Sequence, residues 1–130
     1  MRALVADDDP EMLDLVASTL RGEGLLVAEA VNGADLIRLA TDGPPADLVV
    51  TDVNMPEVGG LEVLSHMQKH HPGVPVILMT SFATRGLCAE AAHKGPAAAI
   101  LSKPFRLDAL REAVAQHRPD TEAKRPDAPA

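Results

Sequence analysis

Acidic, hydroxyl and ammonium side chains directly follow short apolar runs at four separated places in the chain. They are Asp7, Asp8, Asp9, Asp52, Thr80 and Lys103. Carboxylate oxygens are preferred ligands of Mg²⁺, which usually takes one or two of them together with water and a substrate phosphate. Clustered carboxylates also resist ionisation when no cation is present. These residue types therefore indicate a site for a divalent cation and a phosphoryl group.

The same residues suggest a division of chemical roles. Asp8 and Asp52 could supply the two carboxylate ligands of Mg²⁺, and one carboxylate could attack a phosphoryl group. Lys103 would neutralise charge on the transferring oxygens, and Thr80 would donate a hydrogen bond to them. Each residue alone has an ordinary alternative as a helix cap, a turn residue, a strand end or a solvated lysine. Their joint position at strand ends favours the functional interpretation.

Five short apolar runs alternate with segments of helical periodicity. The predicted strands are Ala3–Ala6, Leu25–Ala28, Asp47–Thr51, Val74–Met79 and Ala98–Leu101. The predicted helices begin near Asp9, Asn32, Leu61, Thr84 and Leu107, with Asp9 and Asn32 as caps. This order predicts an α/β fold, a doubly wound parallel sheet with helices on both faces. Ligands of such sheets bind beyond the carboxyl ends of the strands, so the four positions should share one edge.

Length and charge exclude several classes of protein. A chain of 130 residues supports one compact domain. Nineteen acidic against twelve basic side chains give a net charge of −7, which argues against direct binding to a nucleic-acid backbone. Cys88 is the sole cysteine, and no stretch resembles a signal peptide or a membrane span. We therefore expect a cytoplasmic protein without a membrane partner.

The last residues differ in composition from the rest of the chain. Residues 119–130 hold three prolines and no bulky apolar side chain, so they cannot offset the entropy of ordering. We expect a folded domain over residues 1–118. We expect residues 119–130 to be a disordered tail or the beginning of a truncated linker.

Four segments together resemble the receiver domain of two-component response regulators. They are LVADDDP at residues 4–10, DLVVTDVNMPEVGGLE at 47–62, VILMTS at 76–81 and SKPF at 102–105. The resemblance covers residues 2 to about 117 and is nearest to single-domain receivers of the chemotaxis-regulator type. It implies a flavodoxin-like sheet of five strands in the order 2-1-3-4-5, flanked by five helices. It also implies a cis bond between Lys103 and Pro104.

The resemblance implies a role for each site residue. Asp52 would accept a phosphoryl group from a sensor histidine kinase, a histidine phosphotransfer protein or acetyl phosphate. Thr80 and Lys103 would contact the phosphoryl group as it arrives. The metal site, for Mg²⁺, would be made by Asp7, Asp8, Asp52 and the backbone carbonyl of Asn54. Such a domain catalyses only its own phosphorylation and dephosphorylation, and it switches the binding of an output protein that the sequence does not identify.

One position departs from the family pattern. Three residues before Lys103, where the family usually has Tyr or Phe, this chain has Ile100. The aromatic ring that rotates inward in relatives is therefore missing. We expect phosphorylation to be retained and its signal to leave by another route, through the loop that holds Phe82 and Arg85.

Two other classes of function are open from the sequence. A Mg²⁺-dependent hydrolase could use the same carboxylates, although loops of about 2–6 residues leave little material for a substrate pocket. A degenerate receiver could bind partners without being phosphorylated. Incubation with acetyl phosphate and Mg²⁺ separates the three classes by whether an adduct, turnover or neither is observed.

Overall fold

The structure of the protein is a computed structural model that describes residues 1–81, 85–94 and 97–117. Two expectations lie outside the described residues. These are the disordered tail at 119–130, and the loop at 82–84 that includes Phe82 and the predicted helix start at Thr84.

Five strands and five helices alternate along the chain. The strands are β1 (Arg2–Ala6), β2 (Leu26–Ala30), β3 (Leu48–Asp52), β4 (Val76–Thr80) and β5 (Ala99–Ser102). The helices are α1 (Pro10–Gly22), α2 (Gly33–Asp42), α3 (Gly60–His70), α4 (Arg85–Lys94) and α5 (Leu107–His117). All neighbouring strands pair in parallel, in the order β2-β1-β3-β4-β5. The predicted fold class and strand order are confirmed.

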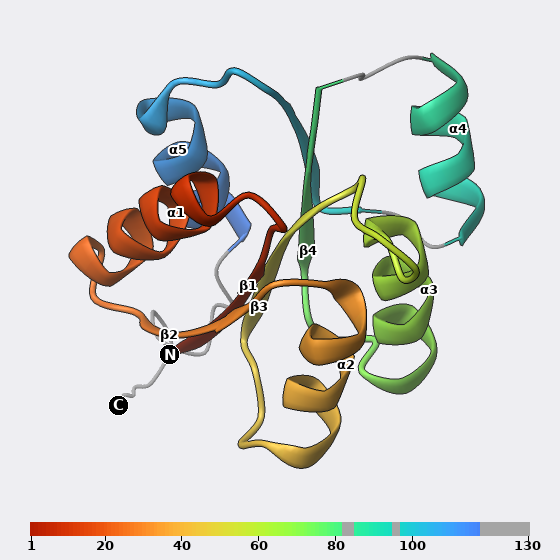
Figure 1. Cartoon of the computed structure of the whole chain (residues 1–130), viewed down its shortest axis with the longest axis horizontal. Coiled ribbons are helices and arrows are strands. Elements are labelled where there is room, and N and C mark those ends of the chain that lie inside the picture. The colour runs from red at the N-terminus through yellow and green to blue at the C-terminus, as the bar shows by residue number, and fades with distance from the viewer. Residues whose placement is uncertain (82–84, 95–96, 118–130) are drawn as a thin grey trace.

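The sheet is the middle of three layers. Helices α1 and α5 cover one face, and α2, α3 and α4 cover the other (Figure 1). Successive side chains of each strand point to opposite faces of the sheet. In β1, Ala3 and Val5 pack under α1 and α5, whereas Leu4 and Ala6 pack under α2 and α3. Both faces of the sheet are covered, so the inner strands β1 and β4 are apolar along most of their length.

The first two helices begin at the predicted caps. Asp9 accepts a hydrogen bond from the backbone N–H of Glu11 at 3.0 Å, and Pro10 is the first residue of α1. Asn32 accepts from the N–H of Asp35 at 2.8 Å at the start of α2. These caps fix where each helix leaves the carboxyl edge of the sheet. Within the described part of the chain, every helix is too short or too polar to cross a membrane.

Candidate functional site

The predicted chemical residues meet at the carboxyl edge of the sheet. Asp7 directly follows β1, Asp52 is the last residue of β3, and Thr80 is the last residue of β4. Lys103 directly follows β5. Parallel strands end at a common edge, and residues far apart in sequence are therefore neighbours here.

Three carboxylates form a compact cluster at this edge. Asp7, Asp8 and Asp52 each place one carboxylate oxygen within 4.8 Å of the other two. Asp7 is 1% exposed and Asp52 is 5% exposed, whereas Asp8 is exposed to solvent. This donor set consists of oxygen alone and is open on one side. It fits a hard cation such as Mg²⁺, which keeps several of its waters.

Lys103 bridges two of the three carboxylates. Its Nζ lies 2.8 Å from Oδ2 of Asp7 and 3.1 Å from Oδ1 of Asp52. The Lys103 side chain is 15% exposed, so water screens these ion pairs weakly. The ammonium thus partly neutralises the cluster from inside the protein, while Asp8 faces solvent.

Burial and neighbouring charges shift two pKa values in the cluster. Burial raises the pKa of Asp52 above its usual value, and the charges of Asp7 and Asp8 raise it further. The hydrogen bond and the charge of Lys103 act in the opposite direction without cancelling the rise. Burial alone would lower the pKa of Lys103, but its hydrogen bonds and charge interactions with Asp7 and Asp52 raise it overall. The lysine therefore remains protonated between the acids.

Asp9 orients the buried carboxylate of Asp7. The backbone N–H of Asp9 donates to Oδ1 of Asp7 at 2.9 Å, which leaves Oδ2 directed at Lys103. The sequence indicated Asp9 as the cap of the first helix but gave no sign of this second contact. Asp9 thus caps α1 and also fixes the orientation of the acidic side chain of Asp7.

The loop after Asp52 folds tightly back onto the end of β3. The N–H of Gly60 donates to the carbonyl of Val53 at 2.9 Å. A Cβ atom at Gly60 would lie 2.5 Å from the carbonyl oxygen of Asp52, so only glycine fits at this position. The N–H of Gly59 donates to Oε1 of Glu62 at 3.0 Å, and this hydrogen bond caps the start of α3. The Gly-Gly pair therefore anchors the loop beside Asp52.

Thr80 and Asn54 occupy different surroundings. Thr80 is 1% exposed, and its carbonyl accepts from the N–H of Lys103 at 2.7 Å, which ties the ends of β4 and β5 together. The bond between Lys103 and Pro104 is cis, as the resemblance implied. Asn54 is exposed in the loop that follows Asp52. The predicted role of its carbonyl as a metal ligand remains a prediction.

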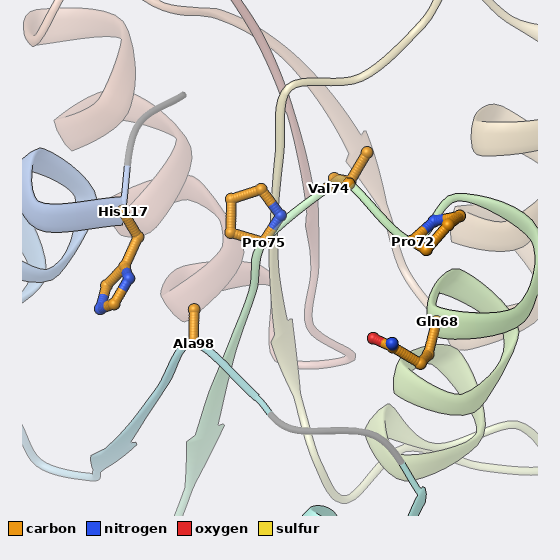
Figure 2. Close-up of a pocket in the computed structure, with 7 residues that line it drawn as sticks. Gln68, Pro72, Val74, Pro75, Ala98 and His117 are labelled. Atoms are coloured by element: carbon orange, nitrogen blue, oxygen red, sulfur yellow. The ribbon is translucent and has the colours of Figure 1, made fainter. Parts of the chain in front are cut away.

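A surface hollow lies at the other end of the sheet. It has a volume of ≈ 430 Å³ and includes residues of the α3–β4 loop, Ala98 before β5, and His117 at the end of α5 (Figure 2). Its polar side chains are Gln68 and His117. Because it borders the amino ends of β4 and β5, it does not serve the carboxylate cluster as a substrate pocket.

Known regulators match most of this chain in sequence. The family model of the response regulator receiver domain matches residues 3–115. The transcriptional regulatory protein GlrR of Escherichia coli is 35% identical over 111 residues, covering 85% of this chain and 24% of that protein. TcrA of Mycobacterium tuberculosis is 36% identical over 112 residues, covering 85% of this chain and 43% of that protein. The chain thus spans less than half of the length of these two relatives.

Solved structures match the fold over nearly the whole described chain. A CheY-like receiver domain of Methanospirillum hungatei has a TM-score of 0.82 at 27% identity, covering 88% of this chain and 90% of its own. TrrA of Thermotoga maritima, solved in complex with Mg²⁺ and BeF, has a TM-score of 0.77 at 31% identity, covering 88% of this chain and 96% of its own. The chain therefore belongs to the response regulator receiver domain family of two-component systems.

Proposed function

We propose that this domain is a phosphorylation switch in which Asp52 accepts a phosphoryl group in a Mg²⁺-dependent reaction. The observation that carries the proposal is the position of the Asp52 carboxylate. It lies at the end of β3, between two further carboxylates that could hold a cation and the ammonium of Lys103. A nucleophile placed between two sources of positive charge is what phosphoryl transfer requires.

Each residue of the site has a defined task in the transfer. Asp7, Asp8 and Asp52, with the carbonyl of Asn54, would hold Mg²⁺, which supplies positive charge to the phosphoryl oxygens. A carboxylate oxygen of Asp52 attacks phosphorus. The bond from phosphorus to the donor breaks, and its electron pair stays on the donor, a histidine nitrogen or the acetate oxygen. The product is an acyl phosphate on Asp52.

Lys103 and Thr80 couple the transfer to a change of conformation. In the structure Lys103 pairs with both Asp7 and Asp52. A phosphoryl group on Asp52 offers Lys103 a new anionic partner, and Thr80 at the end of β4 can donate its hydroxyl to the same group. These contacts exist in only one of the two states, so they shift the equilibrium towards the active arrangement.

The proposed switch needs a phosphoryl donor and an output partner. We place the receiver domain at residues 1–118, in agreement with a family match over 3–115 and with the end of α5 at His117. Its phosphoryl donor is a sensor histidine kinase or a histidine phosphotransfer protein. Its output is the regulated binding of another protein or of a further domain.

Intact-mass measurement after incubation with acetyl phosphate and Mg²⁺ tests the proposal. We expect wild-type protein to gain the mass of one phosphoryl group, and Asp52→Asn and Mg²⁺-free samples to gain nothing. Asp14→Asn, which changes an exposed acid on α1, is the matched control and should be phosphorylated like wild type. Absence of an adduct on wild-type protein would support a phosphorylation-independent interaction module instead, and repeated turnover of the donor without an adduct would support a hydrolase.

A further inference from the structure

Three histidines gather at the carboxyl end of α3, away from the acidic cluster. His66 lies within the helix, His70 is its last residue, and His71 follows directly. The ring centroid of His66 lies 4.5 Å from that of His70 and 6.1 Å from that of His71. Helical spacing alone predicts a solvated pair of His66 and His70. In the structure His70 is exposed as this spacing predicts, whereas His66 is only partly exposed and the ring of His71 lies near it.

One nitrogen of this cluster has no partner. Among the buried side-chain nitrogen and oxygen atoms of the described residues, Nε2 of His66 is the one without a hydrogen bond. A buried polar atom normally has a partner, because leaving it unpaired is unfavourable. The ring of His66 can therefore turn without breaking a hydrogen bond at this atom, and such a turn would bring the nitrogen within reach of a ligand such as a metal ion.

The rings of His70 and His71 both lie near the ring of His66. A tetrahedral zinc ion with Zn–N distances of about 2.0–2.1 Å holds the centroids of two imidazole ligands about 5 Å apart. The two observed centroid distances, 4.5 and 6.1 Å, lie on either side of that value. We propose that His66, His70 and His71 bind one divalent transition-metal ion of the Zn²⁺ class, with water as the fourth ligand.

Ring rotation completes the proposed site. Among the described residues, Asp7, Asp8 and Asp52 have donor atoms that all lie within 4.8 Å of one another, whereas the donor atoms of the three histidines do not. The histidine rings must therefore turn to aim one nitrogen each at a common point. His70 is exposed and His71 is half-buried at the end of the helix, so both rings have room to turn.

The surroundings favour a cation and a neutral imidazole. The carboxyl end of a helix carries partial negative charge, which attracts cations to its last turn. Burial, together with the charges of His70 and His71, lowers the pKa of His66, which favours the neutral form of this ring.

The histidine site is chemically and spatially separate from the acidic site. Imidazole nitrogen suits Zn²⁺, Cu²⁺ and Ni²⁺, whereas the oxygen cluster suits Mg²⁺. Helix α3 begins at Gly60 beside Asp52 and ends at His70. Its 11 residues span about 16 Å at the usual rise of an α-helix. Binding at one site can therefore be measured with the other site saturated.

Titration of the whole chain with Zn²⁺ in excess Mg²⁺ tests the proposal. We expect one equivalent to bind and to shift the ring resonances of His66, His70 and His71 in ¹⁵N-histidine NMR spectra. His70→Gln, at an exposed position, should weaken Zn²⁺ binding at least about tenfold. His117→Gln, which removes a histidine of the hollow in Figure 2, should bind like wild type.

Three results would overturn the proposal. They are the lack of a saturable Zn²⁺ signal, unchanged affinity in His70→Gln, and Zn²⁺-induced shifts at the Asp7–Asp52 edge without shifts of the histidine rings. The ring shifts are read on wild-type protein, so the test does not depend on a variant alone. Phosphorylation of Asp52 plays no part in this measurement.

Discussion

Lys103 Nζ lies 3.1 Å from Oδ1 of Asp52, and the carboxylate of Asp52 is the group that we propose as the phosphoryl acceptor. The same ammonium is 2.8 Å from Asp7. An internal cation thus pairs with two carboxylates of the cluster, and any metal ion or phosphoryl group that bound there would share these carboxylates with it. We therefore expect Lys103 both to stabilise the metal-free site and to compete with ligands that bind there.

The substitution Lys103→Met separates the stabilising effect of Lys103 from its competition with Mg²⁺. We expect the variant to unfold more easily than wild type in metal-free buffer, because two buried carboxylates lose their counter-ion. We also expect it to bind Mg²⁺ several-fold more tightly, because a neighbouring positive charge is gone. Phosphorylation by acetyl phosphate should slow by about 10²-fold, since a group that stabilises charge on the transferring oxygens is lost. Thermal unfolding with and without Mg²⁺, and the rate of adduct formation, check these expectations.

Lys69→Met is the matched control for Lys103→Met. Lys69 is an exposed lysine on α3, so its removal changes the net charge equally without touching the site. We expect its Mg²⁺ affinity and phosphorylation rate to equal those of wild type. If Lys103→Met bound Mg²⁺ more weakly than this control, competition between the ammonium and the metal would be disproved.

Asp52→Asn should stabilise the metal-free protein in a pH-dependent way. The folded pKa of Asp52 is raised above 3.8, so the native state retains this proton at pH values where the unfolded chain has lost it. The free energy of unfolding of wild type therefore falls as pH rises from 3.8 through the folded pKa. Asparagine does not ionise, so the variant lacks this loss.

Urea denaturation at a series of pH values measures the difference between the two proteins. The stability advantage of Asp52→Asn should grow as pH rises from about 4, and it should become constant above the folded pKa. Asp14→Asn, an exposed acid on α1, should follow wild type throughout. An advantage that stayed constant with pH, or that grew towards acid, would contradict the raised pKa.

The layout of the site could be predicted because parallel strands share a carboxyl edge. The positions of Asp7, Asp52, Thr80 and Lys103 at strand ends follow from the alternation of apolar runs and helical segments. The pairing of Lys103 with Asp7 could not be predicted in the same way. It depends on the direction of side chains that are 96 positions apart in the chain.

The predicted strand boundaries were wrong by one or two residues, because turns and exposed polar residues at strand ends cannot be recognised from apolar runs alone. The second strand was predicted to end at Ala28, but β2 continues to Ala30 because an edge strand tolerates the exposed Glu29. The fourth strand was predicted to begin at Val74, but β4 begins at Val76. The backbone N–H of Val74 instead donates to the carbonyl of His71 in a turn. Apolar runs alone do not distinguish a turn residue from a strand residue.

Gly60→Ala should damage the loop beside Asp52. The added Cβ would lie 2.5 Å from the carbonyl oxygen of Asp52 and 2.8 Å from Cα of Val53, so the backbone must move. We expect a loss of about 1–3 kcal/mol in the free energy of unfolding. Gly73→Ala meets no atom within 4 Å and should change stability by less than about 0.5 kcal/mol. Equal losses in the two variants, measured by urea denaturation, would rule out the close approach at Gly60.

We expect Ile100 to limit how far a phosphorylation signal travels from Asp52. This residue is half-buried in the core cluster that also contains Leu87 and Ala91 of α4, and it has no aromatic ring to rotate. We expect beryllofluoride, a phosphoryl mimic, to shift backbone amide resonances near Asp52, Thr80 and Lys103 and to leave α5 nearly unchanged. The comparison is a ¹H–¹⁵N spectrum with and without the mimic in the presence of Mg²⁺.

The control for this experiment is Asp52→Asn, which lacks the carboxylate that beryllofluoride would bind, so its spectrum should not respond. Shifts of wild type that require Asp52 and remain at the carboxyl edge would place the signal in the residues next to the acceptor. Large Asp52-dependent shifts across α4, β5 and α5 would show that the branched side chain of Ile100 transmits the change as an aromatic ring does. The expectation of a different signalling route would then be wrong.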